Sequence, residues 1–107
     1  MSREATWLVC YDIASPRRLR RVHAFLKKHG IAVQYSVFLV HSDRAGLDAL
    51  LQGLRERISP RRDDVRAYRL PRKLWYRSLG APTLPRGLLF VMGGAGSGEP
   101  LFEHRSQ

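Results

Sequence analysis

Residues 7–26 read WLVCYDIASPRRLRRVHAFL, and this stretch decides the fold because an apolar run changes abruptly into a basic helical pattern. Residues 6–13 are apolar nearly throughout, which is typical of a strand covered on both faces. Ser15 then provides a helix N-cap, and Pro16 suits the first helical position. The stretch therefore predicts a strand that is followed directly by a helix over residues 16–29.

The segments that follow repeat this order. Residues 31–41 form one long extended segment, which we expect to be two short strands joined by a bulge near Ser36. Ser42 and Asp43 open a second helix with a regular apolar stripe, and residues 65–70 form a further strand. The resulting order of strand, helix, two strands, helix and strand is the βαββαβ pattern of a ferredoxin-like α+β sandwich.

The C-terminal third of the chain departs from this pattern. Residues 71–86 are rich in proline and look irregular, whereas residues 88–92 (LLFVM) predict a short hydrophobic strand. That strand has no place in a four-stranded sheet, so we expect an extra C-terminal strand that pairs across a homodimer. Residues 1–92 then form one ferredoxin-like domain, and residues 93–107, which begin with a glycine-rich run, form a flexible tail.

The charge of the chain points to a polyanionic partner. Its 107 residues carry 19 Lys and Arg side chains against 9 Asp and Glu, a formal net charge of +10. Such an excess is typical of nucleic-acid-binding proteins. Nearly all the basic residues are arginine, whose planar fork binds phosphate oxygens in pairs. A GC-rich genome or a hot habitat would also enrich arginine, but would not explain the positive sign.

The composition argues against several other classes of protein. A single cysteine, Cys10, leaves no intramolecular disulfide and no cysteine-based zinc site. We find no signal peptide and no apolar run of membrane-spanning length, so we expect a cytoplasmic protein with no membrane partner. The histidines show no metal-ligand spacing, and we assign them no catalytic role; they are His23, His29, His41 and His104.

Asp12 is the residue that chemistry most plausibly needs, because it ends an apolar run where a carboxylate requires a cation or donors. It could cap the first helix, although Ser15 is better placed, or pair with an arginine in residues 17–21. It could also bind a metal at the carboxyl end of the strand. Mg²⁺ is usually held by one or two carboxylates with waters and phosphates. A two-fold axis would bring together two copies of Asp12, whose mutual repulsion a cation would relieve.

Basic residues gather in two stretches, which raises the probability of a nucleic-acid surface above that of a merely solvated helix face. The first, at the start of the first helix, contains Arg17, Arg18, Arg20 and Arg21. The second contains Arg61, Arg62, Arg66, Arg69, Arg72, Lys73 and Arg77. Trp75 and Tyr76 could stack on bases, but packing in a core or a dimer is at least as common for such residues.

Three features together resemble the Cas-two family of small CRISPR-associated proteins. They are Tyr11-Asp12-Ile13, the basic first helix and, most specifically, VQYSVF at residues 33–38, while DVRAY at residues 64–68 looks like the family's next strand. The resemblance covers about residues 7–70. It implies a ferredoxin-like homodimer and a metal-dependent nuclease on single-stranded RNA or double-stranded DNA. It also implies a partnership with the CRISPR integrase in spacer acquisition.

The resemblance assigns roles to single residues. Asp12 corresponds to the family's metal-binding aspartate and Tyr11 to the tyrosine beside it, and we take both as catalytic. A basic residue of the first helix carries over to Arg21, and the serine and phenylalanine of the strand motif to Ser36 and Phe38. With Arg17, Arg18 and Arg20, these three form the expected nucleic-acid-binding set. Many relatives carry an arginine where this chain has Ala32, which removes one candidate phosphate contact.

Three hypotheses follow from these observations. The first is a Mg²⁺-dependent phosphodiesterase with Asp12 from each subunit at a dimer cleft and arginines along the nucleic-acid backbone. The second is a non-catalytic dimeric scaffold whose basic surface grips duplex DNA for the integrase. The third, less favoured, is a toxin-like ribonuclease of the same fold.

Overall fold

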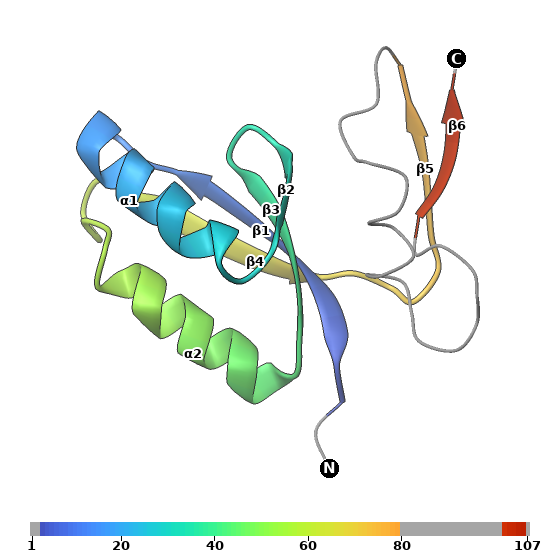
Figure 1. Cartoon of the computed structure of the whole chain (residues 1–107), viewed down its shortest axis with the longest axis horizontal. Helices are drawn as coiled ribbons and strands as arrows, with labels where there is room; N and C mark the ends of the chain where they lie inside the picture. The colour runs from blue at the N-terminus through green and yellow to red at the C-terminus, as the bar shows by residue number, and fades with distance from the viewer. Residues whose placement is uncertain (1–2, 80–101, 107) are drawn as a thin grey trace. The chain divides into compact units, whose positions relative to one another are not determined.

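The computed structural model describes residues 3–79 and 102–106, and the chain divides into two units, Met1–Arg69 and Leu70–Gln107. The first unit has the expected βαββαβ order (Figure 1). Its elements are β1 (Ala5–Asp12), α1 (Pro16–Lys27), β2 (Ile31–Gln34), β3 (Val37–Ser42), α2 (Arg44–Arg55) and β4 (Asp64–Arg69). The predicted α+β fold class is therefore confirmed.

The four strands form one antiparallel sheet in the order β2-β3-β1-β4, and both helices lie against one face of it. Side chains alternate between the two faces of a strand, so every second residue of β1 and of β3 points towards the helices. Val9 pairs with Phe38, and both are buried at the centre of the core. The remaining core residues are Tyr11, Val22, Leu26, Val40, Leu47, Leu50 and Leu54.

Both helices begin where the sequence predicts. The Ser15 hydroxyl accepts from the backbone N–H of Arg18 at 3.3 Å, and the Asp43 carboxylate accepts from that of Gly46 at 2.7 Å. The first turn of α1 contains no acidic residue. The helix ends at Lys27, two residues before the predicted end, because the following backbone N–H groups bond three residues back and tighten the last turn.

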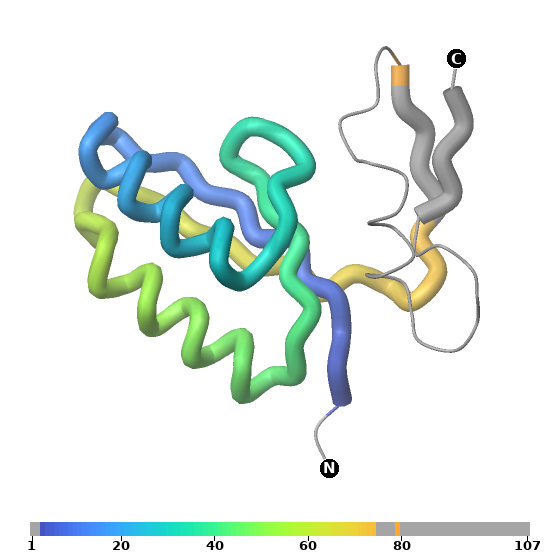
Figure 2. The backbone as a smooth tube through the Cα atoms, viewed as in Figure 1, coloured from blue at the N-terminus to red at the C-terminus, as the bar shows by residue number. Residues whose placement is uncertain are grey.

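The long extended segment is two strands, as expected, and they are joined by a turn at Tyr35 and Ser36 (Figure 2). Ser36 has a φ of 64°, a left-handed conformation that a non-glycine residue rarely adopts. The irregularity in strand pairing lies between Ala32 and Gln34 rather than at Ser36. The chain therefore reverses direction at Ser36 and shifts register slightly before it.

The second unit differs from the expectation for the C-terminal third. It contains β5 (Leu74–Ser78) and β6 (Phe102–Ser106), which pair in parallel. β5 lies in the segment 71–86, which we expected to be irregular, and β6 lies in the segment 93–107, which we expected to be a flexible tail. The two units divide at residue 69, whereas we expected a division at residue 92. Parallel pairing between distant segments leaves no local signal in the sequence. The predicted strand at 88–92 lies outside the described residues.

No helix among the described residues is long and apolar enough to cross a membrane.

Candidate metal site and nucleic-acid interface

Asp12 is the last residue of β1, and its carboxylate is exposed. It pairs across the sheet with Asp64, the first residue of β4, and directly paired residues of an antiparallel sheet point to the same face. Asp64 accepts from Arg66 Nε at 2.9 Å. Asp12 has no ion pair or side-chain hydrogen bond within the described part of the chain. The strand-end position predicted for Asp12 is confirmed.

Of the interpretations open for Asp12, two find no support in this arrangement. Ser15, not Asp12, caps α1. Among the described residues, no arginine of positions 17–21 pairs with Asp12, and Arg18 pairs with Asp63 instead. An exposed carboxylate without a protein partner, beside a second carboxylate, remains suited to a hard cation. The residues therefore fit Mg²⁺, with Asp12 as the free ligand.

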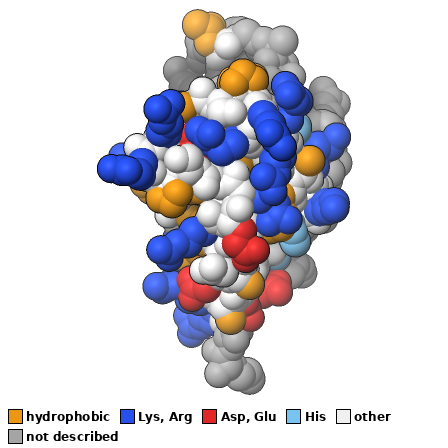
Figure 3. All heavy atoms as spheres, turned by 90° about the vertical axis from the view of Figure 1, so that its left-hand side faces the viewer, with side chains coloured by type: hydrophobic (Ala, Val, Ile, Leu, Met, Phe, Trp, Pro, Cys, Tyr) orange, Lys and Arg blue, Asp and Glu red, His pale blue; other side chains and the backbone are white. Residues whose placement is uncertain are grey.

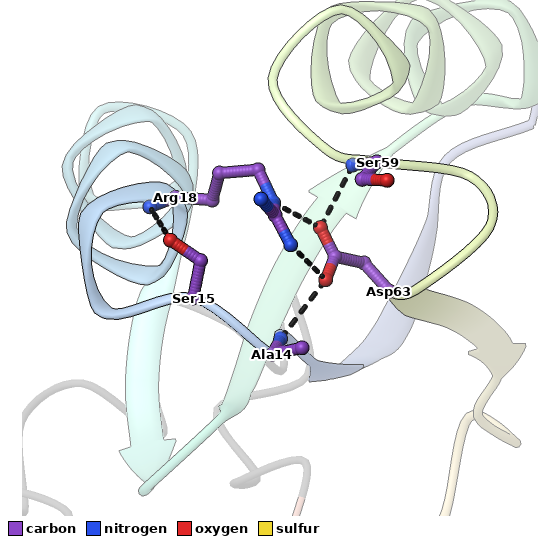
Figure 4. A network of polar contacts seen from close by, with 5 residues as sticks. All are labelled: Ala14, Ser15, Arg18, Ser59 and Asp63. Carbon is purple, nitrogen blue, oxygen red and sulfur yellow. Dashed lines mark hydrogen bonds and ion pairs between the residues drawn. The ribbon is translucent and has the colours of Figure 1, made fainter.

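Asp63 is the most constrained acid at this end of the sheet, and its side chain is fully buried. Its carboxylate accepts from Arg18 Nε at 2.7 Å and Nη2 at 3.0 Å, and from the backbone N–H groups of Ala14 at 2.9 Å and Ser59 at 2.8 Å (Figure 4). The bonds from Arg18 first, and those from the two backbone groups, hold the pKa of Asp63 well below its usual range against the opposing effect of burial.

The Asp63 network ties two loops together. Ala14 lies between β1 and α1, whereas Ser59 and Asp63 lie between α2 and β4. The carboxylate thus joins the chain just after Asp12 to the chain just before Asp64. This geometry sets the positions of the two exposed carboxylates relative to each other.

Arg18 has a different partner from the one expected of a nucleic-acid-binding residue. Two of its guanidinium nitrogens donate to Asp63, and only 27% of its side chain is exposed. A guanidinium whose fork already holds a carboxylate is not free to bind a phosphate in the same way. The structure therefore gives Arg18 a role in the fold, although it is adjacent in sequence to the exposed Arg17.

The other predicted arginines of α1 are exposed, and they are Arg17, Arg20 and Arg21. Because Asp63 bonds to Arg18 and Ala14, the turn that carries exposed Arg61 and Arg62 lies against the start of α1. Figure 3 looks at this end of the molecule and shows Lys and Arg side chains dominating it. The start of the second basic stretch, Arg61 and Arg62, thus lies near the first stretch at one end of the sheet.

Tyr11 and Asp12 lie on opposite faces of the sheet, so the structure does not bring this predicted catalytic pair together. Tyr11 is 6% exposed and belongs to the core beneath the helices. Its hydroxyl lies 3.4 Å from Nδ1 of His23 on α1. Burial first, and then nearby Tyr35, raise the pKa of the Tyr11 phenol, which stays protonated at neutral pH.

Of the two strand-motif residues, Phe38 is placed differently from the expectation, whereas Ser36 is partly exposed in the β2–β3 turn. Phe38 is 1% exposed and packs in the core, where its ring meets the His23 ring edge-on at 5.3 Å between centroids. The Ser36 carbonyl accepts from the backbone N–H of Tyr11 at 3.1 Å. The motif therefore supports the end of β1 from within the fold, and a buried Phe38 ring presents no surface to nucleic acid.

Sequence reasoning missed Asp63 and His23. Asp63 is adjacent to Asp64 in a turn, and nothing local distinguishes the buried acid from the exposed one. His23 follows Leu19 by one helical turn, which places it at the edge of the apolar stripe of α1. That spacing could have indicated a contact with the core rather than with solvent alone.

Comparison with known proteins identifies relatives of this chain. The family model for CRISPR associated protein Cas2 matches residues 5–77. A CRISPR-associated endoribonuclease Cas2 of Nitrosomonas europaea is 42% identical over 82 residues, which cover 77% of this chain and 78% of the relative. Another, from Thermodesulfovibrio yellowstonii, is 40% identical over 74 residues, which cover 69% and 81% respectively.

Solved structures agree with the sequence comparison. Cas2 of Streptococcus pyogenes superposes with a TM-score of 0.57 and 31% identity, over 62% of this chain and 86% of that protein. A hypothetical protein of Thermus thermophilus superposes with a TM-score of 0.69 and 29% identity, over 78% of this chain and 99% of that protein. The chain belongs to the Cas2 family of CRISPR-associated proteins.

Proposed function

We propose that this protein is a homodimeric, metal-dependent endonuclease that hydrolyses phosphodiester bonds in nucleic acid. The observation that carries the proposal is Asp12, an exposed carboxylate with no protein partner among the described residues. It lies at the end of the sheet where the arginines of α1 meet Arg61 and Arg62 of the α2–β4 turn. The relatives named as endoribonucleases support RNA as a substrate. Duplex DNA remains the second substrate that the basic surface suits.

The sheet face opposite the helices supports the homodimer. Alternation places Leu8 and Cys10 of β1 and Val37 and Leu39 of β3 on that face, and they pair with one another across the two strands. A solvated sheet face would carry polar side chains at such positions. Leu39 is already buried in the single chain, whereas Leu8, Cys10 and Val37 are partly exposed. A second copy packed here by two-fold symmetry would cover these three side chains and would place two Asp12 carboxylates at one seam.

The donor set supports a cation shared between subunits. Within residues 3–79 and 102–106 no group of three or more His, Cys, Asp or Glu side chains could hold a metal ion. A second protomer would add its own Asp12, and Mg²⁺ needs only one or two carboxylates besides water and phosphate oxygens. When bound, the cation would polarise the phosphate and lower the pKa of a water molecule.

The chain's own residues then have separate tasks. Asp12 provides the metal-binding oxygen atoms, and Asp63 holds the loop behind it in place through Ala14. Exposed arginines, led by Arg17 and Arg21, neutralise the phosphate backbone and orient it towards Asp12. The ion pair from Arg66 compensates the charge of Asp64, which would otherwise repel both Asp12 and the substrate.

A cleavage assay tests the nuclease. End-labelled RNA and duplex DNA of one sequence are incubated with the protein, with Mg²⁺ or with EDTA. Asp12→Asn is compared with Asp48→Asn, which changes another exposed acid, on α2, that pairs with Arg44 at 3.9 Å. We expect activity to disappear with EDTA and to fall at least about 100-fold in Asp12→Asn only. Cleavage that survives in Asp12→Asn would contradict the proposal.

The scaffold is the second candidate, and the exposed arginines of α1 and of the α2–β4 turn favour it. In this role the dimer grips duplex DNA and joins it to the CRISPR integrase, and Asp12 is not needed. Duplex binding is measured against salt for wild type and Asp12→Asn. Equal, salt-sensitive binding without Mg²⁺-dependent cleavage would select the scaffold.

A further inference from the structure

Tyr35 is a large aromatic side chain held out from the protein at the β2–β3 turn. It is 86% exposed. The turn that carries it is not a loose loop, because Gln34 pairs with Val37 on either side of it. Ser36 takes up a φ of 64° there, a conformation that costs a non-glycine residue about 1–2 kcal/mol and persists where the surroundings demand it.

The Tyr35 turn is attached to the end of β1. The Ser36 carbonyl accepts the backbone N–H of Tyr11 at 3.1 Å, which continues the β1–β3 register beyond the pair Cys10 and Val37. Asp12 is the next residue of β1, so Tyr35 and Asp12 belong to the same end of the sheet.

The chemistry of this end of the sheet indicates what the Tyr35 ring contacts. A single exposed aromatic residue is ordinary on a protein surface. Here, however, the ring projects from a turn at the end of the sheet that also carries Asp12 and the exposed arginines at the start of α1. Arginines that hold a phosphate backbone, combined with an aromatic ring that receives a base, are the two components of single-strand binding sites.

We propose that Tyr35 is a specificity-determining residue that stacks on an unpaired nucleobase next to the phosphate held at Asp12, so that the site selects single-stranded nucleic acid. The inference rests on the proposed nuclease. Bases in a duplex are already stacked on their neighbours, and they offer no free face to this ring. The arginines would still bind duplex phosphates, so discrimination lies in Tyr35 and not in the charge.

Binding experiments in EDTA test the stacking separately from catalysis. A fluorescently labelled RNA 12-mer and its duplex are titrated with wild type, Tyr35→Ala, Tyr35→Leu and Tyr35→Phe. Stacking predicts that Tyr35→Ala and Tyr35→Leu bind the single strand about 5- to 150-fold more weakly, while Tyr35→Phe binds like wild type. Duplex affinity stays within about two-fold in every variant, because it depends on phosphate contacts.

Two controls sharpen the result. Tyr68→Ala removes a different tyrosine, which is half-exposed on β4, and should leave single-strand affinity unchanged. Replacing single nucleotides of the RNA by abasic ones should weaken wild type at one position and have no further effect on Tyr35→Ala at that position. Light scattering checks that the Tyr35 variants keep the wild-type oligomeric state.

Several outcomes would overturn the inference. They are unchanged single-strand binding in Tyr35→Ala, full recovery in Tyr35→Leu, an equal loss on duplex, or a change of oligomeric state that accounts for the loss. Failure of the nuclease gives a different result, namely no Mg²⁺-dependent cleavage by wild type. Cleavage that is lost in Asp12→Asn but keeps the wild-type preference for single strands in Tyr35→Ala would keep the nuclease and reject the stacking.

Discussion

Asp12 and Asp63 lie at the same end of one sheet, yet their surroundings differ completely. Asp63 is fully buried and accepts four N–H bonds, two of them from a guanidinium. Asp12 is exposed, faces another carboxylate across the strands and has no partner in the described part of the chain. The comparison teaches that two aspartates at or next to one strand pair can differ entirely: Asp63 holds the loops at this end of the sheet, whereas Asp12 stays exposed without a partner among the described residues.

The largest expected effect is on stability in Asp63→Ala. Removing this carboxylate leaves Arg18 partly buried without its partner and two backbone N–H groups unsatisfied, which should lower the free energy of unfolding by about 3–5 kcal/mol. Urea denaturation followed by circular dichroism measures it. Asp48→Ala, which breaks an exposed pair with Arg44, should cost less than about 1 kcal/mol. An equal loss of unfolding free energy in Asp63→Ala and Asp48→Ala would contradict the special structural role of Asp63.

The pH dependence of stability should be the next largest effect. The pKa of Asp63 is lowered in the folded state, so the unfolded chain binds more protons in acid. The contribution of Asp63 is therefore complete above the ordinary aspartate pKa of about 3.9 and is lost as pH falls below it. The free energy of unfolding, measured by urea denaturation between pH 5 and pH 2, should decline more steeply for wild type than for Asp63→Asn, by up to about 1.4 kcal/mol per pH unit. If the stability of wild type and of Asp63→Asn changed with pH in parallel, the lowered pKa of Asp63 in the ion pair would be contradicted.

Adjacent arginines separate the two roles at a smaller energy. Arg17→Ala should weaken nucleic-acid binding by about 1 kcal/mol and reduce the slope of log affinity against log salt by about 1, with little change in stability. Arg18→Ala should destabilise the fold and, where it remains folded, should keep the wild-type salt slope. Binding titrations at several salt concentrations measure the slope, and urea denaturation measures the stability. A reduced salt slope in Arg18→Ala, or a destabilised fold in Arg17→Ala, would contradict the prediction.

The smallest effect should be that of Asp12→Asn on stability. With no donor to lose and one like charge fewer opposite Asp64, the free energy of unfolding should change by less than about 0.5 kcal/mol. A larger loss would mean that Asp12 has a structural partner, and it would remove the contrast with Asp63.

Local chemistry accounts for the part of this molecule that the sequence predicts well. The Ser15 and Asp43 caps, the apolar stripes and Gly30 mark both helices, and their order between the strands leaves few topologies. Asp12 is found at the strand end for the same reason, because an acid that closes an apolar run is visible in the sequence.

Two kinds of feature could not be predicted: which face of the sheet a side chain occupies, and which residues far apart in the sequence contact each other. β1 is apolar on both faces, so nothing local shows that Tyr11 faces the helices while Asp12 faces away from them. Arg18 and Asp63 are 45 residues apart, and either of two neighbouring acids could have been its partner. The parallel pairing of Leu74 with Phe102 is likewise non-local.

The first turn of α1 has a further consequence, since it has arginines and no acid of its own at the positive end of a helix dipole. Asp63 neutralises Arg18 from another element, but the exposed guanidiniums still repel one another. Adding potassium chloride screens that repulsion, so heat denaturation should shift to higher temperature in the same salt range in which oligonucleotides dissociate. Protein self-repulsion and the proposed binding of polyanions would thus be two results of one uncompensated charge.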